Sequence, residues 1–164
     1  MADIAGLIAI WATMAAAQAP SPMVEPRMTI AAATRACLDV TGPAGIDEPR
    51  LRSAGWEAYD IELGEASDSS LRIYNHGRGP VLLAGPGEES EKSGCIVIAP
   101  LTAGLTFDTV AAAISTEFRV QPTERKAAEV IWVMGDKGVL LALAGGKIRP
   151  AVNVTVVQNV EGIK

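Results

Sequence analysis

The stretch that most constrains the fold of this chain is residues 129–158, which reads as three consecutive β-strands. Residues 130–134 and 139–144 are apolar at almost every position, so a strand formed by either run presents apolar side chains on both faces. Residues 152–156 instead alternate apolar and polar side chains, which is typical of a strand with one wet face. Short turns containing glycine separate the three runs. The pattern predicts two strands covered on both sides and a third exposed on one side, in a meander that runs from the interior of a sheet toward its edge.

The segments upstream of this meander predict helices and further strands. Residues 106–118 carry the clearest helical pattern, because their apolar side chains recur at the three-and-four spacing of one helix face. The other expected elements are helices at 28–38 and 47–54, and strands at 57–63, 71–74, 81–84 and 95–99. We expect Asp47 and Thr106 to cap the helices that begin beside them, and Asp108 to complement the dipole of the second of these helices. Strands and helices do not alternate regularly, which argues against a parallel doubly wound sheet.

We therefore expect an α+β fold, in which two or three helices pack on a mainly antiparallel sheet of about six strands. Each group of three strands follows a helix, so the order is also compatible with a duplicated helix-plus-three-strand unit. The two halves share no residue pattern, and the duplication stays open on the sequence alone.

The first residues of the chain read as an export signal. An apolar run at 4–17 is followed by Ala17, Gln18 and Ala19, which fit the small-x-small form of a cleavage site. An uncleaved anchor and a buried N-terminal helix are the alternatives, but the run is short against the roughly 20 residues that a membrane-spanning helix needs. After cleavage we expect no stable membrane span. The expected organisation is a signal peptide at 1–19, an extended linker at 20–27 and a single domain at 28–164.

The chain has two cysteines, Cys37 and Cys95, which predict a single disulfide formed in an oxidising compartment. Two separate buried thiols are the alternative. A catalytic redox pair is disfavoured, because no Cys-x-x-Cys spacing is present to lower a thiol pKa. Together with the signal peptide, the pair predicts a periplasmic or secreted bacterial protein.

Charge and composition argue against several kinds of ligand. The formal charge of −5 comes from dispersed residues, whereas a nucleic-acid partner requires a concentrated basic face. With one histidine and no Cys-x-x-Cys pattern, the chain lacks the usual zinc ligand sets. Glu88, Glu89 and Glu91 lack the spacing of a calcium loop and read as a solvated acidic loop. No phosphate-loop motif is present either, so we expect neither a metal nor a cofactor.

Catalytic motifs are also missing from the sequence. No serine lies in a Gly-x-Ser-x-Gly or Ser-x-x-Lys pattern, and the single imidazole, that of His76, lies in a predicted turn. Asp60 and Glu62 share one face of a predicted strand, although nothing predicts that this face is concave. The sequence therefore favours a non-enzymatic protein, with a cell-envelope hydrolase assembled only by the fold as the alternative.

One polar cluster is a candidate ligand site. Arg72, Asn75, His76 and Arg78 gather positive charge and hydrogen-bond donors at the tip of a predicted hairpin in an otherwise acidic protein. Such a tip suits a carboxylate or phosphate group of a ligand. The alternative is an exposed hairpin that is polar only for solubility.

These observations favour an exported binding or interaction module whose partner is an unknown envelope protein or a small anionic ligand. A binding module is expected to show an exposed apolar patch or an open sheet edge. A hydrolase is expected to show a pocket with at least two convergent ionisable groups of shifted pKa. A structural protein, whose strand at 152–157 pairs with a partner strand, is the third possibility.

Overall fold

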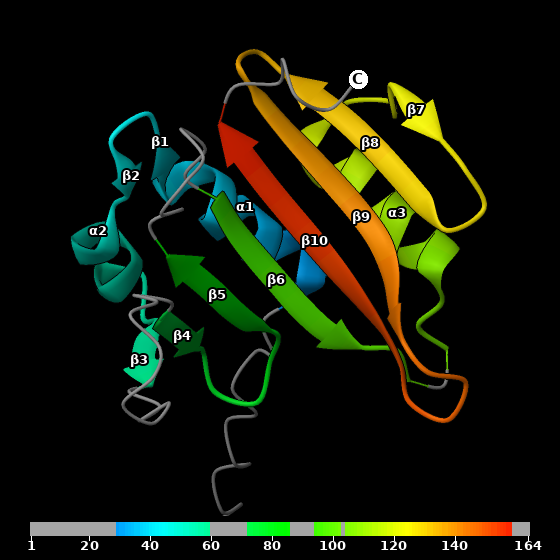
Figure 1. The fold of residues 1–164 in the computed structure, drawn as a ribbon, viewed down its shortest axis with the longest axis horizontal. Coiled ribbons are helices and arrows are strands. Elements are labelled where there is room, and N and C mark those ends of the chain that lie inside the picture. Colours follow the sequence, from blue (N-terminus) through cyan, green and yellow to red (C-terminus); the bar gives the residue numbers. More distant parts are fainter. Residues whose placement is uncertain (1–28, 60–71, 86–93, 103, 159–164) are drawn as a thin grey trace, which may run out of the picture.

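The structure, a computed structural model, describes residues 29–59, 72–85, 94–102 and 104–158. Three helices pack on one face of an eight-stranded antiparallel sheet, and a small two-stranded hairpin lies beside it (Figure 1). The predicted α+β class is confirmed. The predicted signal peptide and linker, the acidic loop of Glu88 to Glu91, and the pair Asp60 and Glu62 all lie outside the described residues.

The helices are α1 (Ile30–Val40), α2 (Glu48–Ser53) and α3 (Phe107–Phe118), and the small hairpin is formed by β1 (Thr41–Gly42) and β2 (Gly45–Ile46). The strands of the main sheet are β3 (Glu57–Tyr59), β4 (Arg72–Asn75), β5 (Val81–Gly85), β6 (Gly94–Pro100), β7 (Glu124–Arg125), β8 (Glu129–Met134), β9 (Lys137–Gly145) and β10 (Pro150–Gln158). The main sheet has eight strands where about six were expected, and β7 is the one that no predicted strand range covers. This strand consists of two charged residues and has no apolar pattern from which to predict it.

The strands lie in the order β3-β4-β5-β6-β10-β9-β8-β7. From each edge of the sheet to its centre, the strands follow the order of the chain: β3 to β6 from one edge and β7 to β10 from the other. Each half of the fold therefore begins with a segment that contains a helix and continues with a four-strand meander that ends at the centre of the sheet. The expected repeating unit had three strands, and the structure has four in each half. The central strands β6 and β10 pair antiparallel, with Val97 opposite Val154.

The prediction that the last strand lies toward an edge is wrong. β10 pairs with β6 on one side and with β9 on the other, so its backbone groups are used along both sides. This pairing also removes the structural-protein reading, in which the strand at 152–157 accepts a partner strand. The polar residues of β10, Asn153 and Thr155, alternate with buried valines because one face of the sheet carries no helix, and not because the strand lies at an edge.

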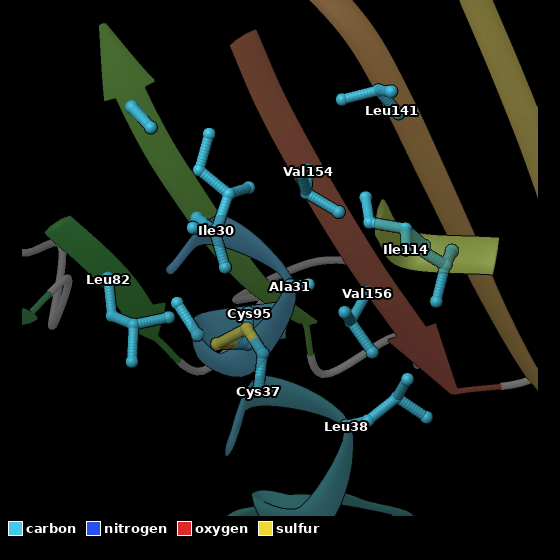
Figure 2. Close-up of a cluster of buried hydrophobic side chains, with 14 of the residues drawn as sticks. Ile30, Ala31, Cys37, Leu38, Leu82, Cys95, Ile114, Leu141, Val154 and Val156 are labelled. Carbon is cyan, nitrogen blue, oxygen red and sulfur yellow. A yellow bond between two sulfur atoms is a disulfide. The ribbon is translucent and has the colours of Figure 1, made fainter. Parts of the chain in front are cut away.

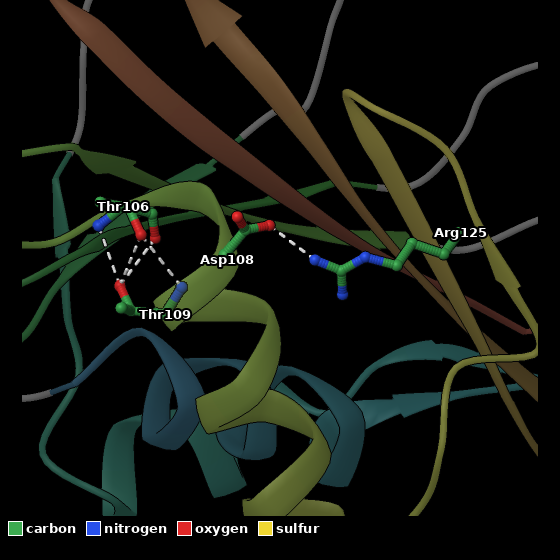
Figure 3. Close-up of polar contacts among 4 residues, drawn as sticks. All are labelled: Thr106, Asp108, Thr109 and Arg125. Atoms are coloured by element: carbon green, nitrogen blue, oxygen red, sulfur yellow. Dashed lines mark hydrogen bonds and ion pairs between the residues drawn. The ribbon is translucent and has the colours of Figure 1, made fainter.

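Local capping explains why α3 begins at Phe107. The hydroxyl of Thr106 accepts a hydrogen bond from the Thr109 amide at 3.2 Å, and the Thr109 hydroxyl accepts one from the Thr106 amide at 2.8 Å (Figure 3). Asp108 in the first turn pairs with Arg125 of β7 at 2.6 Å, which ties the helix to the edge of the sheet. The cap at Thr106 and the first-turn role of Asp108 were both expected from the sequence.

The core lies between the sheet and the helices α1 and α3. The strand pairings place one side chain from each of six neighbouring strands in a single row, and every member of the row is fully buried. The row consists of Tyr74, Leu82, Val97, Val154, Leu141 and Val130. Several of these side chains are seen beneath α1 and α3 in Figure 2.

The disulfide between Cys37 of α1 and Cys95 of β6 crosses this core, with the two Cα atoms 5.7 Å apart (Figure 2). Both cysteines are fully buried, and the predicted pairing is confirmed. A structural disulfide of this kind is typical of an oxidising compartment. Within the described ranges, none of the helices has both the length and the apolar character needed to cross a bilayer.

Candidate functional site

The face of the main sheet opposite the helices carries many apolar side chains, and we call it the open face. All three helices lie on the other side of the sheet (Figure 1). The strand pairings place a second row of side chains across the open face, parallel to the buried row. From β3 to β8 this row consists of Tyr59, Ile73, Leu83, Ile96, Thr155, Leu140 and Ile131.

Most side chains of the open face are half-buried and Ile131 is buried at 9% exposure, whereas Tyr59 is 57% and Val133 39% exposed. The runs that are apolar on both faces had been expected to be covered on both sides. The structure corrects this expectation, because the helices cover only the face that carries Val130, Trp132 and Leu141. The second apolar face of β8 and β9 is left without a helix.

Among the described residues, the charged side chains of the open face lie on its outer strands. Glu57 lies on the edge strand β3, and Glu124 and Glu129 lie on β7 and β8. The ammonium of Lys126 is 2.9 Å from a carboxylate oxygen of Glu124 and 3.9 Å from one of Glu129. The hydrogen bond and charge of Glu124 raise the pKa of Lys126. Three carboxylates and one ammonium give the margin a formal charge of −2, and the centre of the face is uncharged.

The four residues of the predicted ligand cluster point in different directions. Arg72 forms an ion pair with Glu48 of α2, on the helix side of the sheet. Asn75 lies on the open face, because its position alternates with Tyr74 of the buried face. His76 packs edge-on against Trp56, with the ring centroids 5.7 Å apart. Arg78 lines an apolar pocket beside α1 and α3. That these four residues bind a ligand together stays a prediction, since the structure does not bring them to one place.

The packing of His76 explains the glycine at position 55. Gly55 has φ +85°, and a Cβ atom there would lie 3.0 Å from Nε2 of His76. Both the left-handed backbone and the close imidazole favour the residue without a side chain. The role of His76 in the described structure is therefore to cover Trp56, which is 1% exposed.

Two residues beside Glu48, Arg72 and Tyr74, have shifted pKa values, and neither of them lines the pocket beside Arg78. The negative charge of Glu48 raises the pKa of Arg72. Burial raises the pKa of Tyr74, and the charge of Glu48 raises it further. The hydroxyl of Tyr74 is buried and has no hydrogen bond of ordinary geometry. This arrangement is that of an ion pair beside a buried phenol.

Replacing Tyr74 with phenylalanine is expected to leave the protein equally stable at pH 7, or more stable by up to about 1 kcal/mol, because the lost hydroxyl is unpaired. The raised pKa means that the phenol ionises in the unfolded chain first, at about pH 10, while it stays neutral in the folded protein. Stability is therefore lost as the pH rises above about 10.

Urea unfolding of wild type and Tyr74→Phe between pH 7 and 11 measures this difference. The wild type is expected to lose more stability than the variant above pH 10. Identical pH profiles for the two proteins would show that Tyr74 does not titrate differently in the folded state.

A pocket of about 370 Å³ lies between the first turn of α1, the start of α3 and the facing ends of β5 and β6. Its lining is almost entirely apolar, and Arg78 supplies the one charged side chain. The lining residues are Thr29, Ile30, Ala31, Arg78, Gly79, Pro80, Ala99, Pro100, Leu105, Val110 and Ala113. Within the described part of the chain, Arg78 has no carboxylate partner.

No motif in the sequence pointed to this pocket, because its lining comes from four separate segments of the chain. The described residues contain no cluster of histidine, cysteine or carboxylate side chains able to hold a metal ion. Comparison of the whole chain with known proteins found no matching family model, no matching curated protein and no matching solved structure.

Proposed function

We propose that this protein is a non-enzymatic binding module of the cell envelope, and that it recognises a protein partner through the open face. The observation that supports this most is the row of seven side chains, one from each of seven neighbouring strands, which contains no charged residue and is apolar except for Thr155. Monomeric proteins rarely expose a continuous apolar patch of several hundred Å² unless it has a function.

The size of the open face suits a protein partner. Seven strands about 4.8 Å apart, each with two or three outward side chains ~6.6 Å apart, make an area of roughly 600 Å². A partner that covers this area buries about 1,200 Å² counted on both surfaces, which is the lower end of specific protein interfaces.

Charge favours a different protein over a second copy of this chain. The margin of the open face has a formal charge of −2, from Glu57, Glu124, Glu129 and Lys126. Two copies packed face to face would bring acidic margins together, and like charges across an interface oppose association. The partner that fits presents an apolar surface bordered by lysine and arginine side chains.

The disulfide supports an extracytoplasmic location, which is the periplasm or the exterior of a bacterial cell. The competing function, a cell-envelope hydrolase, would require a pocket with convergent ionisable groups. Arg72 and Tyr74 have shifted pKa values, but neither lines the described pocket, whose one charged residue is Arg78. The described residues therefore support binding better than catalysis.

Site-specific photocrosslinking in the producing cell tests the proposal. A photoreactive amino acid at Leu83 or Leu140, on the open face, is expected to form a discrete adduct with one partner. The same amino acid at Ala112 or Thr116, on the exposed side of α3, serves as the control and is expected to form none. The variant Ile96→Thr, which makes the centre of the row polar while keeping a β-branched side chain, is expected to weaken both adducts.

The identity of the adduct decides between the possible occupants. A partner crosslinked through an apolar surface bordered by basic side chains supports the proposal. An adduct of twice the mass of this chain would show that a second copy occupies the face. Equal crosslinking from the open face and from α3, or none from either, would contradict a dedicated binding surface.

A further inference from the structure

We infer that the pocket between α1 and α3 is a second binding site, and that it takes a small amphiphilic carboxylate. The carboxylate would pair with Arg78 at the mouth, and a short alkyl chain would enter the apolar interior. This inference does not depend on the open face, which lies on the other side of the sheet from the helices.

The dimensions and lining of the pocket suit a small ligand. Its volume of about 370 Å³ lies within the range of small-molecule sites, which are mostly apolar with a few placed polar groups. Side chains of α1, β6 and α3 line it, among them Ile30, Ala99 and Val110, and all three are buried. An alkyl chain in this space replaces water against apolar surface, which is favourable by about 25 cal/mol per Å².

The positive charge of Arg78 favours an anionic ligand. Four other arginines of the described residues are paired with carboxylates: Arg35 with Glu117, Arg52 and Arg72 with Glu48, and Arg125 with Asp108. The described arginines without an ion pair are Arg50, Arg78, Arg119 and Arg149, and of these only Arg78 lines the pocket. Arg78 lines the pocket without such a partner among the described residues. Its guanidinium presents a planar set of donors that matches the two oxygens of a carboxylate.

The backbone holds Arg78 at the mouth of the pocket. The loop that carries it joins β4 to β5, which are paired along their length, and Pro80 next to β5 is buried. Proline fixes its own φ, so the buried Pro80 anchors the loop at the start of β5, two residues after Arg78. One guanidinium against an apolar lining complements a monoanion with a tail better than a dianion.

Isothermal titration of the purified protein with octanoate, octylammonium and octanol tests the inference. Octanoate is expected to bind to a single site, and octylammonium is expected not to bind, because the Arg78 charge repels it. Octanol is expected to bind at least tenfold more weakly than octanoate, because it lacks the charge that strengthens the hydrogen bonds to Arg78.

Two pairs of matched variants locate the site. Arg78→Gln is expected to weaken octanoate binding at least tenfold, whereas Arg50→Gln, on the exposed surface of α2, which contributes no residue to the pocket lining, leaves it unchanged. Ala113→Phe fills the pocket from the exposed side of α3 and is expected to abolish binding, whereas Ala112→Phe on the same helix does not line the pocket and leaves binding unchanged.

Thermal unfolding of each variant first checks that the variant is folded, and its affinity for octanoate is then measured. Failure of the wild type to bind octanoate at millimolar concentration would overturn the inference. So would octanoate binding that Ala113→Phe leaves intact, because the ligand then lies elsewhere. Equal affinity of wild type and Arg78→Gln would overturn recognition of the carboxylate by Arg78.

Discussion

Loss of the disulfide in a Cys37→Ala/Cys95→Ala variant is expected to lower the free energy of unfolding by about 4 kcal/mol. The bond closes a loop across 58 residues of sequence. Opening a loop of this length returns conformational entropy to the unfolded chain, and that entropy corresponds to about 4 kcal/mol at 25 °C. For a domain of this size, the melting temperature is expected to fall by roughly 15 °C. Thermal and urea unfolding measure both quantities.

Chemical reduction of the wild type provides the control for this variant. A reductant is expected to lower the melting temperature of the wild type and to leave that of the double variant unchanged. If the reductant does not change the stability of the wild type, although a thiol assay shows both cysteines free, the bond does not stabilise the fold.

Replacing Trp132 with alanine is expected to lower the free energy of unfolding by about 4 kcal/mol, because a large side chain leaves a cavity in the core. Trp132 is fully buried on the helix-covered face of β8. Its indole N–H donates to the hydroxyl of Ser115 on α3 at 3.0 Å, so the residue joins the sheet to the helix by packing and by a hydrogen bond. Urea unfolding at pH 7 measures the loss.

Two further variants separate the effects of packing, of the hydrogen bond and of position in β8. Trp132→Phe keeps most of the buried apolar surface and removes the donor, so we expect a smaller loss of about 1 to 2 kcal/mol. Val133→Ala changes the next residue of the strand, which points to the open face and is 39% exposed, and is expected to cost under about 1 kcal/mol. Similar losses for Trp132→Ala and Val133→Ala would contradict the assignment of the two faces.

The features that the sequence predicted well depend on interactions between residues close together in the chain. Asp47 caps α2 and Thr106 caps α3, because each side chain accepts a hydrogen bond from an amide three residues later. The hairpin of β4 and β5 was predicted from the glycines and proline between its strands. The pairing of Cys37 with Cys95 followed from the cysteine count, since two is the smallest number that forms a bond.

The candidate ligand cluster shows why closeness in sequence is a poor guide to a site on a strand. Arg72 and Asn75 are three positions apart, so they point to opposite faces of β4. Arg72 turns toward Glu48 on α2, and Arg78 reaches the pocket beside α1 and α3. Neither neighbour can be predicted from the hairpin sequence, because both depend on how distant segments pack.

The amino-acid sequence by itself determined which segments are helices and strands, where the helices begin, and that an antiparallel sheet with one disulfide forms, because hydrogen bonds and side-chain periodicity within each segment specify these features. Only the tertiary structure decided that β10 lies at the centre of the sheet, that β8 and β9 are covered on one face, and that a pocket forms beside Arg78. An apolar side chain has the same chemistry whether this chain or a partner covers it, so the order of the strands and the placement of the helices decide which apolar surface is left for binding.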